Sequence, residues 1–526
     1  MKKIDVLIAG AGPAGLATAI RLKQRLKQAG RSESVAVIEK ASQLGYHSLS
    51  GGVFESACLD ELVPDWRKSE DLFVKSMVEI KRDELYFLTA RKAYQIPHCL
   101  VPAGMRHVGD HAISVARLVA WLGKLAEKEG VEIYPGFSAE KLLVEGKTVK
   151  GLKLLDSGRD KAGQPKANFQ TGDEIEAGVT VLADGGRGVL SRQLIPLLGE
   201  GKNPQVYSIG MKQLIKLPPG NAFGNDRAIH TLGFPSRGDV FGGAFLYSMG
   251  DDVVALGIIL GLDWKYSDMN GQRELEILKT HPFIADLLKG GQVMVTGAKV
   301  IPEGGYYALP ELYTAGALLV GDAAGFVNME KIKGIHYAIR SGICAADTIF
   351  DALGKGDLSA AALASYRGHL EHRGVLPDLR KARNFRQSFK HGTFLGLPLS
   401  QIQSLLPFRL TMEQDHLATR PGAKLNRTPV GMDKPEFTSL SGAMHREDEP
   451  SHLKILDAAV CAECSETYGS PCVLFCPGEV YRMKGHEMIV SHTNCLHDGS
   501  CQVKCPRQNI LWTPPEGGEG PRYKNM

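Results

Sequence analysis

The sequence lacks several features that would restrict its function at once. It contains no uninterrupted apolar run of the ~18–20 residues that a membrane-spanning helix needs. Its net charge of +4 is too small to indicate nucleic-acid binding by itself. The segment from Met1 to Ala9 leads straight into an expected strand, with no room for a signal or transit peptide. These absences favour a protein that is soluble or bound to a membrane surface.

A catalytic arrangement of polar side chains is also missing. Residues 207–305 contain no Ser/His/Asp set and no carboxylate pair in a convincing context. The 16 histidines are scattered along the chain, and we expect most of them to be structural.

Cysteine is scarce outside one stretch. Seven of the ten cysteines fall in the segments Cys461-Ala-Glu-Cys464, Cys472-Val-Leu-Phe-Cys476-Pro477 and Cys495-Leu-His-Asp498-Gly-Ser-Cys501-Gln-Val-Lys-Cys505-Pro506. Two Cys-x3-Cys-Pro endings, each preceded by paired ligands, are typical of an iron–sulfur electron-transfer module. Cysteines at metal-ligand spacings, rather than spread as disulfide partners, also fit a reducing compartment.

The opposite end of the chain carries a dinucleotide motif. An apolar run from Ile4 to Ala9 predicts a buried strand, and Gly10-Ala-Gly12-Pro-Ala-Gly15 follows it, before a helix over about residues 16–28. The glycines permit a tight turn, close approach to a pyrophosphate and close helix–strand packing. A second strand, Val35 to Glu39, ends in an acid that can hold a ribose hydroxyl.

Later segments identify the dinucleotide. Residues 179–185 are a strand ending in Asp184-Gly185, and Leu318-Leu-Val-Gly321-Asp322-Ala-Ala-Gly325 is another, before a helix. A late strand with Gly-Asp resembles the large FAD-dependent oxidoreductase and hydroxylase superfamily, which implies that the prosthetic group is FAD. Asp322 can also act as a plain helix cap, and Arg117 is either a phosphate ligand or a solvated arginine. The predicted cofactor-binding residues are Gly10, Gly12, Ala14, Gly15, Glu39, Lys40, Arg117, Asp184, Gly185, Gly321, Asp322, Gly325 and Asn328.

Two further regions have a distinct pattern. Residues 207–305 show short alternating strands, which suit an antiparallel sheet inserted between strands of the FAD domain. Residues 380–390 are basic and are followed by the apolar segments 394–399 and 402–408, interrupted by prolines. This pattern suits a surface that dips into a membrane interface, although a helix end and a core loop would read the same way.

Several segments together resemble one family, the electron transfer flavoprotein–ubiquinone oxidoreductases. They are Gly45-Tyr-His-Ser-Leu-Ser-Gly-Gly, His230-Thr-Leu-Gly-Phe-Pro, Phe241-Gly-Gly-Ala-Phe-Leu-Tyr, Gly325-Phe-Val-Asn-Met-Glu-Lys-Ile-Lys-Gly-Ile-His, Ser439-Leu-Ser-Gly-Ala-Met-His and Trp512-Thr-Pro-Pro-Glu-Gly-Gly-Glu-Gly-Pro. The resemblance implies a monotopic membrane enzyme with FAD, one 4Fe–4S cluster and a quinone pocket. It places Gly242 and Gly243 against the quinone head group, with Phe241 where the family has tyrosine.

The cysteine-rich tail departs from that family. Cys476-Pro-Gly-Glu-Val-Tyr481 matches it, but the family's middle cysteine is replaced by Asp498, and four further cysteines are extra. In two-cluster ferredoxins the cysteine before proline ligates the other motif's cluster. We therefore expect two clusters. The first set is Cys476, Cys495, Asp498 and Cys501, and the second is Cys461, Cys464, Cys472 and Cys505.

The metal content keeps alternatives open. Aspartate is a harder ligand than thiolate, so the cluster at Asp498 is expected either to lose iron and become 3Fe–4S or to remain 4Fe–4S with carboxylate ligation. Tyr481 is the candidate for tuning its potential through a hydrogen bond. Zinc bound by Cys461, Cys464, Cys472 and one further cysteine is the main rival to a second 4Fe–4S cluster, and a vestigial set without metal is another.

We predict an α/β protein with a FAD-binding Rossmann-like domain of the glutathione-reductase type, an inserted antiparallel sheet and a C-terminal ferredoxin-like iron–sulfur domain. The expected boundaries are residues 1–200 and 305–380 for the FAD-binding domain and 201–304 for the quinone- or substrate-binding β domain. Residues 381–450 are expected to form a membrane-surface and linker region, and 451–526 the iron–sulfur domain.

The resemblance implies transfer of electrons from reduced electron transfer flavoprotein, through iron–sulfur and FAD, to membrane ubiquinone or menaquinone. It further implies peripheral, monotopic attachment at the cytoplasmic face of a bacterial inner membrane, with no nucleic-acid partner. Two alternatives stay open. One is a geranylgeranyl-reductase-like enzyme that reduces isolated double bonds. The other is a ferredoxin-like electron-carrier subunit of a larger complex.

Overall fold

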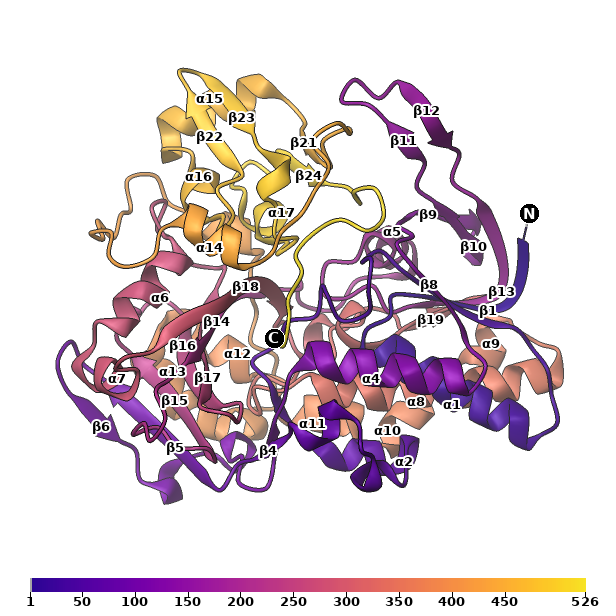
Figure 1. Cartoon of the computed structure of the whole chain (residues 1–526), viewed down its shortest axis with the longest axis horizontal. Helices are drawn as coiled ribbons and strands as arrows, with labels where there is room; N and C mark the ends of the chain where they lie inside the picture. The colour runs from indigo at the N-terminus through magenta and orange to yellow at the C-terminus, as the bar shows by residue number, and fades with distance from the viewer. Residues whose placement is uncertain (1) are drawn as a thin grey trace.

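The computed structural model describes residues 2–526, except for the side chains of Lys2 and Phe394. Figure 1 shows a region of helices around a central sheet on the right and a region dominated by a second sheet on the left. Most of the C-terminal residues, in yellow, form a third region above the other two, and the C-terminus itself lies between those two.

An eight-stranded sheet is the centre of the first region. Strands β19-β20-β13-β1-β2-β8 lie side by side, and β10 pairs with β13 and with β9. β1 pairs in parallel with β13 and β2, and β13 with β20, so strands distant in sequence meet. The strands are β1 (Lys2–Ala9), β2 (Val35–Glu39), β8 (Glu132–Pro135), β9 (Ala139–Glu145), β10 (Thr148–Leu154), β13 (Glu174–Leu182), β19 (Tyr313–Thr314) and β20 (Ala317–Leu319).

Helices α1 (Pro13–Gln28), α4 (Val115–Lys128) and α8 (Ile335–Lys355) pack against this sheet. α1 and α8 approach closely because small residues face each other where they cross. A Cβ on Gly342 of α8 would overlap the Ala14 carbonyl oxygen of α1. The close packing aims the N-terminus of α1 at the end of β1, where the glycine turn lies.

The second sheet has the strand order β18-β14-β17-β16-β15-β5-β6. Neighbours are antiparallel except for β15 and β5, which are parallel. Residues 82–95, which lie within the expected FAD-binding range, supply two of these strands. The strands are β5 (Arg82–Leu88), β6 (Ala93–Gln95), β14 (Tyr207–Lys216), β15 (Arg227–Gly233), β16 (Gly242–Ser248), β17 (Val253–Gly261) and β18 (Gln292–Pro302).

The third region is built from short elements that carry the cysteines. Its hydrophobic core is continuous with that of the second sheet, because Phe475, Leu496 and Val503 belong to the same buried cluster as Ile209 and Leu260. The elements are β21 (Leu453–Ile455), α15 (Ala458–Tyr468), α16 (Pro471–Phe475), β22 (Tyr481–Lys484), β23 (Glu487–Val490), α17 (Ser500–Lys504) and β24 (Ile510–Trp512).

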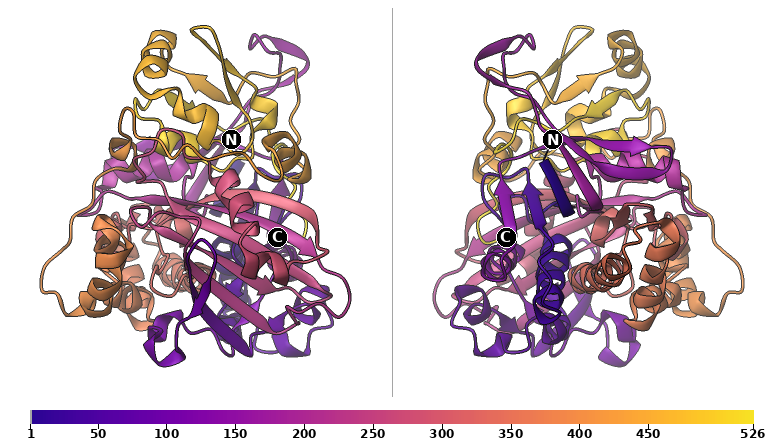
Figure 2. Two further views of the ribbon diagram at one scale, coloured as in Figure 1. Left: turned by 90° about the vertical axis from the view of Figure 1, so that its left-hand side faces the viewer. Right: turned by 90° about the vertical axis from the view of Figure 1, so that its right-hand side faces the viewer.

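The predicted α/β fold class, with a Rossmann-like domain, an inserted sheet and a C-terminal iron–sulfur domain, is confirmed. No helix within residues 2–526 is both long and apolar enough to cross a bilayer. In the two views of Figure 2 the orange helices α11 (Val375–Lys381), α12 (Phe385–Ser388) and α13 (Thr393–Ile402) lie to one side, apart from the yellow region.

The turn between β1 and α1 depends on Gly10. Its φ is +109°, and a Cβ there would overlap the Ala183 carbonyl oxygen. We expect Gly10→Ala to lower the free energy of unfolding by more than ~1 kcal/mol, because backbone strain and overlap add. Thermal denaturation would measure the loss. Gly368→Ala, in α10 (Ser365–His372) with open space at the Cβ, is the matched control and should be neutral or stabilising. Equal melting temperatures for wild type and Gly10→Ala would contradict this expectation.

Candidate functional site

A cavity of about 370 Å³ lies where the two sheets and the cysteine-bearing region meet. The glycine turn after β1 forms one end of it, and strands β14, β16 and β18 form a wall. The remaining walls come from residues 45–53, 183–190, 320–338 and 497–502. Three parts of the chain that are distant in sequence therefore share one enclosed site.

Most of the predicted cofactor-binding residues line this cavity. They are Gly10, Gly12, Ala14, Glu39, Lys40, Asp184, Gly185 and Asp322. Gly15, Gly321, Gly325, Asn328 and Arg117 are not among the lining residues. Gly15 and Gly321 pack immediately behind the lining, because a Cβ on Gly15 would overlap the Gly10 carbonyl and one on Gly321 would lie 2.9 Å from the Ala14 Cβ.

Two of the predicted ligands have contacts away from the cavity. Arg117 Nε donates to Asn525 Oδ1 at 2.9 Å, at the start of α4. The Asn328 side-chain oxygen accepts from the amides of Glu330 and Lys331 at 3.0 and 3.1 Å and organises that turn. Their roles toward a cofactor stay predictions.

The acids of the cavity are held by backbone amides. Glu39 accepts from the Ala11 amide at 3.0 Å and from the Ala41 amide at 2.8 Å. Asp184 Oδ2 accepts from the amides at the start of α5 (Val189–Leu198), while its Oδ1 is buried with no partner among the described residues. Burial raises the pKa of Asp322 to about 6. These carboxyls are positioned as acceptors for hydroxyl groups of a bound molecule.

Three lysines give the cavity a positive character. Desolvation lowers the pKa of Lys40 and of Lys212 to about 7 and also lowers that of Lys299. Lys212 Nζ donates to the Ser50 carbonyl at 3.0 Å and forms no ion pair among the described residues. Enclosed cations are unfavourable without counter-charges. Together with the α1 N-terminus, which has no side-chain cap, they fit a phosphate-bearing cofactor such as FAD.

The predicted quinone residues lie at the start of β16. Gly242 has φ +148°, and a Cβ there would overlap the Ile259 carbonyl oxygen on β17. The Phe241 ring contacts Phe389 at a centroid distance of 5.1 Å, and the Arg386 guanidinium lies over it at 3.9 Å. Phe241 thus belongs to an apolar cluster with Val327, Met329, Ile301, Ala382, Phe385 and Phe389. Val327, Met329 and Ile301 also line the cavity, so this cluster connects the cavity with α12.

The cysteines lie in two groups, and short helices arrange them. α16 carries Cys472 at its start and Cys476 at its end, and α17 carries Cys501 and Cys505 in the same way. Cys461, Cys464, Cys472 and Cys505 line a cavity of about 20 Å³. Burial, followed by the adjacent Cys501, Asp498 and Cys476, raises the pKa of Cys495. Each of these two helices therefore contributes one thiol to each group.

The spacing of the sulfurs can be compared with that of a zinc site. Tetrahedral zinc with bonds of ~2.3 Å brings its sulfur ligands to about 3.8 Å from one another. Among the described residues, no three cysteine thiols lie within 4.8 Å of each other. The spacing within each full group is therefore wider than that of a formed tetrahedral zinc site, and the kind of metal that each group binds stays a prediction.

Hydrogen bonds reach several of these sulfurs. Asn509 donates to Cys505 Sγ from its backbone amide and to Cys461 Sγ from its side chain, both at 3.3 Å. The His497 amide donates to Cys495 Sγ at 3.4 Å. The buried Tyr481 hydroxyl lies beside Cys501 and lowers the pKa of that thiol against the larger effect of burial, without reaching hydrogen-bond geometry. Such donors set the potential of a bound cluster.

Asp498 has contacts on both sides of its loop. Its side chain accepts from the Ser500 amide at 2.9 Å, and burial raises the pKa of its carboxyl. Its backbone carbonyl accepts from the Val300 amide of β18 at 3.0 Å. Because residues 497–499 also line the large cavity, the first cysteine group lies directly behind a cavity wall.

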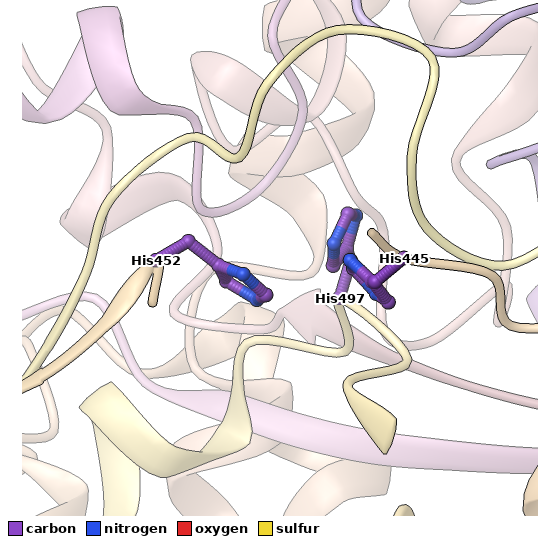
Figure 3. Close-up of side chains that lie close together, drawn as sticks. All are labelled: His445, His452 and His497. Atoms are coloured by element: carbon purple, nitrogen blue, oxygen red, sulfur yellow. The ribbon is translucent and has the colours of Figure 1, made fainter. Parts of the chain in front are cut away.

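The side chains of three histidines pack together beside this loop, and we call this cluster the histidine wedge. Figure 3 shows His445, His452 and His497 turned toward one another, with centroids 5.0–5.3 Å apart. His445 Nε2 lies 2.9 Å from the Cys495 carbonyl oxygen. Burial holds the pKa of His452 and of His497 well below the usual range, so both are neutral. The wedge therefore packs against the loop without adding those charges.

Sequence reasoning missed several residues of the cavity. Lys212, Tyr247, Lys299, Lys333 and His497 line it but were not predicted. Lys212 had a signal, because it is a lysine within an otherwise apolar strand. Tyr247 had none, because its position depends on how distant strands pair.

Family models of known proteins match segments in each of the three regions of the chain. Residues 429–524 match the family model described as electron transfer flavoprotein-ubiquinone oxidoreductase, 4Fe-4S, and residues 207–301 match the model described as ETF-QO, ubiquinone-binding. Residues 8–59 match the model of a NAD(P)-binding Rossmann-like domain. Each region that the structure separates thus has its own match.

Relatives that match along most of their length are also named electron transfer flavoprotein-ubiquinone oxidoreductase. A probable electron transfer flavoprotein-ubiquinone oxidoreductase of Schizosaccharomyces pombe is 37% identical, over 99% of this chain and 86% of its own length. The human electron transfer flavoprotein-ubiquinone oxidoreductase is 35% identical, over 100% of this chain and 89% of its own length. The Pseudomonas aeruginosa protein of that name is 35% identical, over 100% of this chain and 99% of its own length.

Solved structures share the fold at low identity. A geranylgeranyl bacteriochlorophyll reductase-like protein from Thermoplasma acidophilum matches with a TM-score of 0.58 and 20% identity, over 78% of this chain and 94% of that one. The flavin-dependent brominase Bmp2 matches with a TM-score of 0.53 and 18% identity, over 76% and 90%. Both likenesses concern the fold alone.

The two cysteine groups predict two interacting clusters. Electron paramagnetic resonance of the dithionite-reduced protein should show spin–spin splitting, and metal analysis should find iron without stoichiometric zinc. Cys472→Ser should remove about half of the iron, because it lies in the group apart from the cavity. Cys99→Ser, at an exposed cysteine, is the control and should keep all of it. A single isolated paramagnetic signal together with one zinc ion per chain would contradict the two-cluster hypothesis.

Proposed function

The chain belongs to the electron transfer flavoprotein–ubiquinone oxidoreductase family, and on that premise we propose which of its parts take up, carry and deliver electrons. The protein is an oxidoreductase that accepts electrons from reduced electron transfer flavoprotein and reduces a quinone. Bound FAD and iron–sulfur clusters supply the electron-transfer chemistry. The chain's own residues bind these groups, exclude water and hold the substrate.

One observation carries the assignment of the parts. The loop of residues 497–502 holds two proposed ligands of the first cluster, Asp498 and Cys501, and its residues His497, Asp498, Gly499 and Gln502 line the large cavity. Electron transfer needs close approach of donor and acceptor, and this shared wall supplies it. We assign the cavity to FAD, with Glu39 and Asp322 accepting from its hydroxyl groups and the α1 N-terminus facing its phosphates.

We assign the apolar cluster around Phe241 to the quinone. It extends from the cavity to Phe385 and Phe389, and helix α12 packs against α13 of the segment 393–408, so an apolar substrate that enters from that segment would meet these apolar side chains. Gly242 and Gly243 allow close backbone approach at its inner end. Ubiquinone and menaquinone have the same apolar character in their tails, so both fit this assignment.

We further propose peripheral attachment to a membrane through residues 393–408. Leu395 is 67% exposed and Leu405 is 79% exposed, and Ile402 and Phe408 are at least half exposed. The side chain of Phe394, also part of the predicted segment, lies outside the described residues. Basic Lys381 and Arg383 flank the segment, and Arg383 donates to the Ser404 and Leu406 carbonyls at 2.8 Å. Apolar side chains beside cations suit an anionic bilayer surface.

Not every cation of the basic run takes part. Arg386 is 1% exposed and pairs with Asp263 at 2.7 Å and Glu303 at 3.3 Å. It therefore organises the interior next to Phe241 rather than the surface. The proposed location is the cytoplasmic face of a bacterial inner membrane, a setting that suits the reduced cysteines and the bacterial relative.

The reaction is tested on the purified protein with reduced electron transfer flavoprotein as donor. We expect reduction of a soluble quinone analogue, and no reduction of an isolated double bond in a prenyl substrate. Alkene reduction would support the geranylgeranyl-reductase-like alternative instead. Absence of both activities in the loaded protein would support the electron-carrier subunit.

The membrane segment is tested by vesicle flotation. The double variant Leu395→Ser/Leu405→Ser should lose most of its binding to anionic vesicles, because the exposed leucines supply the buried apolar area. Its reduction of a soluble quinone analogue should stay unchanged. Leu456→Ser, at a leucine 62% exposed in the iron–sulfur region, is the matched control and should bind as wild type does. Undiminished binding of the double variant to anionic vesicles would show that residues 393–408 do not attach the protein to a membrane.

A further inference from the structure

Three polar side chains meet on one face of the second sheet. Ala228 of β15 pairs with Asp83 of β5 on one side and with Tyr247 of β16 on the other. His230, two residues along β15, points to the same face because side chains alternate along a strand. The register of three strands thus brings Asp83, His230 and Tyr247 together, although they lie far apart in the sequence.

These side chains form a row that leads from Tyr247 through His230 to Asp83. The Tyr247 hydroxyl lies 2.6 Å from His230 Nε2. On the opposite edge of the imidazole ring, His230 Nδ1 lies 4.0 Å from Asp83 Oδ1. Asp83 Oδ2 accepts from the His107 amide at 2.7 Å, which fixes the carboxyl in place. The one gap in the row is short enough for a small side-chain rotation to close.

The row connects two cavities. Tyr247 lines the large cavity, where it stacks on Phe245 with centroids 4.6 Å apart. Asp83 and His230 line a separate cavity of about 30 Å³, together with Gln95 and His98. Gln95 and His98 are exposed, so this small cavity borders the protein surface. The row therefore runs from the small surface cavity, across strands β5, β15 and β16, to the large cavity.

The surrounding charges are consistent with proton movement. Burial lowers the pKa of His230 well below its usual range and raises the pKa of Asp83 and of Tyr247. The groups that face the row are His107, His98 and Lys333, with Asp110 behind them as the partner of Lys333. Neither ring nitrogen of His107, which is 1% exposed, makes a hydrogen bond among the described residues, and its Nδ1 lies 3.5 Å from Asp110 Oδ2. At neutral pH the ring of His230 is neutral and can exchange protons at both nitrogens.

We propose that Tyr247, His230 and Asp83 form a proton relay from the surface to the large cavity, where it supplies protons for quinone reduction. The inference rests on the proposed function, because reduction of a quinone to a quinol consumes two protons along with two electrons. The electrons arrive from the established donor, and the relay supplies protons alone. Tyr247 is the catalytic residue of the three, and His230 and Asp83 act through it.

The transfer balances at each member. The Tyr247 hydroxyl releases its proton into the large cavity, for delivery to the quinone oxygen, and receives one from His230 Nε2–H. His230 takes up a proton at Nδ1 from the Asp83 carboxyl, and solvent in the small cavity returns a proton to Asp83. No member ends with a changed proton count, but the proton of His230 has moved from Nε2 to Nδ1, so the ring must return to the Nε2–H tautomer before the second proton passes.

The test compares Tyr247→Phe, His230→Gln and Asp83→Asn with wild type in the FAD- and cluster-loaded protein. Quinone turnover should fall about 10- to 100-fold and should become dependent on pH and sensitive to D₂O, because proton delivery then limits the rate. Flavin reduction by electron transfer flavoprotein without quinone should stay within about twofold of wild type, because electrons do not use the row. Added imidazole should restore turnover in His230→Ala.

A second measurement needs no quinone. Proton uptake during photoreduction of the bound flavin, followed with an indicator dye in weak buffer, should be slowed in the same variants. Tyr86→Phe is the matched control, because the Tyr86 hydroxyl bonds Glu84 at 2.7 Å outside the cavity lining. If wild type itself fails to reduce quinone, the proposed function fails, and the dye measurement still decides the relay.

Two results would overturn the relay. One is wild-type turnover and wild-type proton uptake in Tyr247→Phe and His230→Gln, at unchanged flavin content. The other is a stoichiometric divalent metal in the wild-type protein that His230→Gln loses, because Asp83, His107 and His230 would then be metal ligands.

Discussion

The hydrogen bond from the Val300 amide to the Asp498 carbonyl joins the edge of the second sheet to the loop that carries the first cluster ligands. It extends β18 by one backbone contact into the iron–sulfur region and so fixes the distance between that loop and the cavity. The shared hydrophobic core and the histidine wedge support the same contact from both sides. An electron carrier and a flavin held this way need no domain motion to exchange electrons.

The two cysteine groups are not equivalent in position. The first group adjoins the cavity, whereas the second lines its own small cavity on the outer side, and the groups meet at Cys472 and Cys476. On the proposed assignment, the cluster of the second group would lie farther from the large cavity than the cluster of the first group. Asn509 donates to two sulfurs of the outer group, whereas the His497 amide donates to Cys495 Sγ of the inner group, so the two groups have different hydrogen-bond environments. Different environments tune potentials separately.

Motifs of residues close together in the sequence predicted much of this structure. The pairing of strands that are distant in the sequence could not be predicted in the same way. The Cys-x3-Cys-Pro spacing reflects one short helix with a thiol at each end, so the grouping of cysteines follows from residues near one another in sequence. The glycine turn after β1 is equally local. Asp83 and Tyr247, by contrast, meet only because β5 and β16 flank β15 in one register. A run of basic residues likewise cannot reveal that Arg386 is enclosed, because its partners Asp263 and Glu303 come from other segments.

The loop of residues 497–502 serves two tasks at once, and this links the maturation of the two cofactors. On the proposed assignment, a loop that owes its shape partly to iron ligation also closes the cavity that binds flavin. A chain folded in an iron-starved cell would keep the glycine turn and the lysines but lose an ordered wall. Such a chain would release flavin more readily and would admit dioxygen to what it retained, so a shortage of one nutrient would appear as a defect in the use of another.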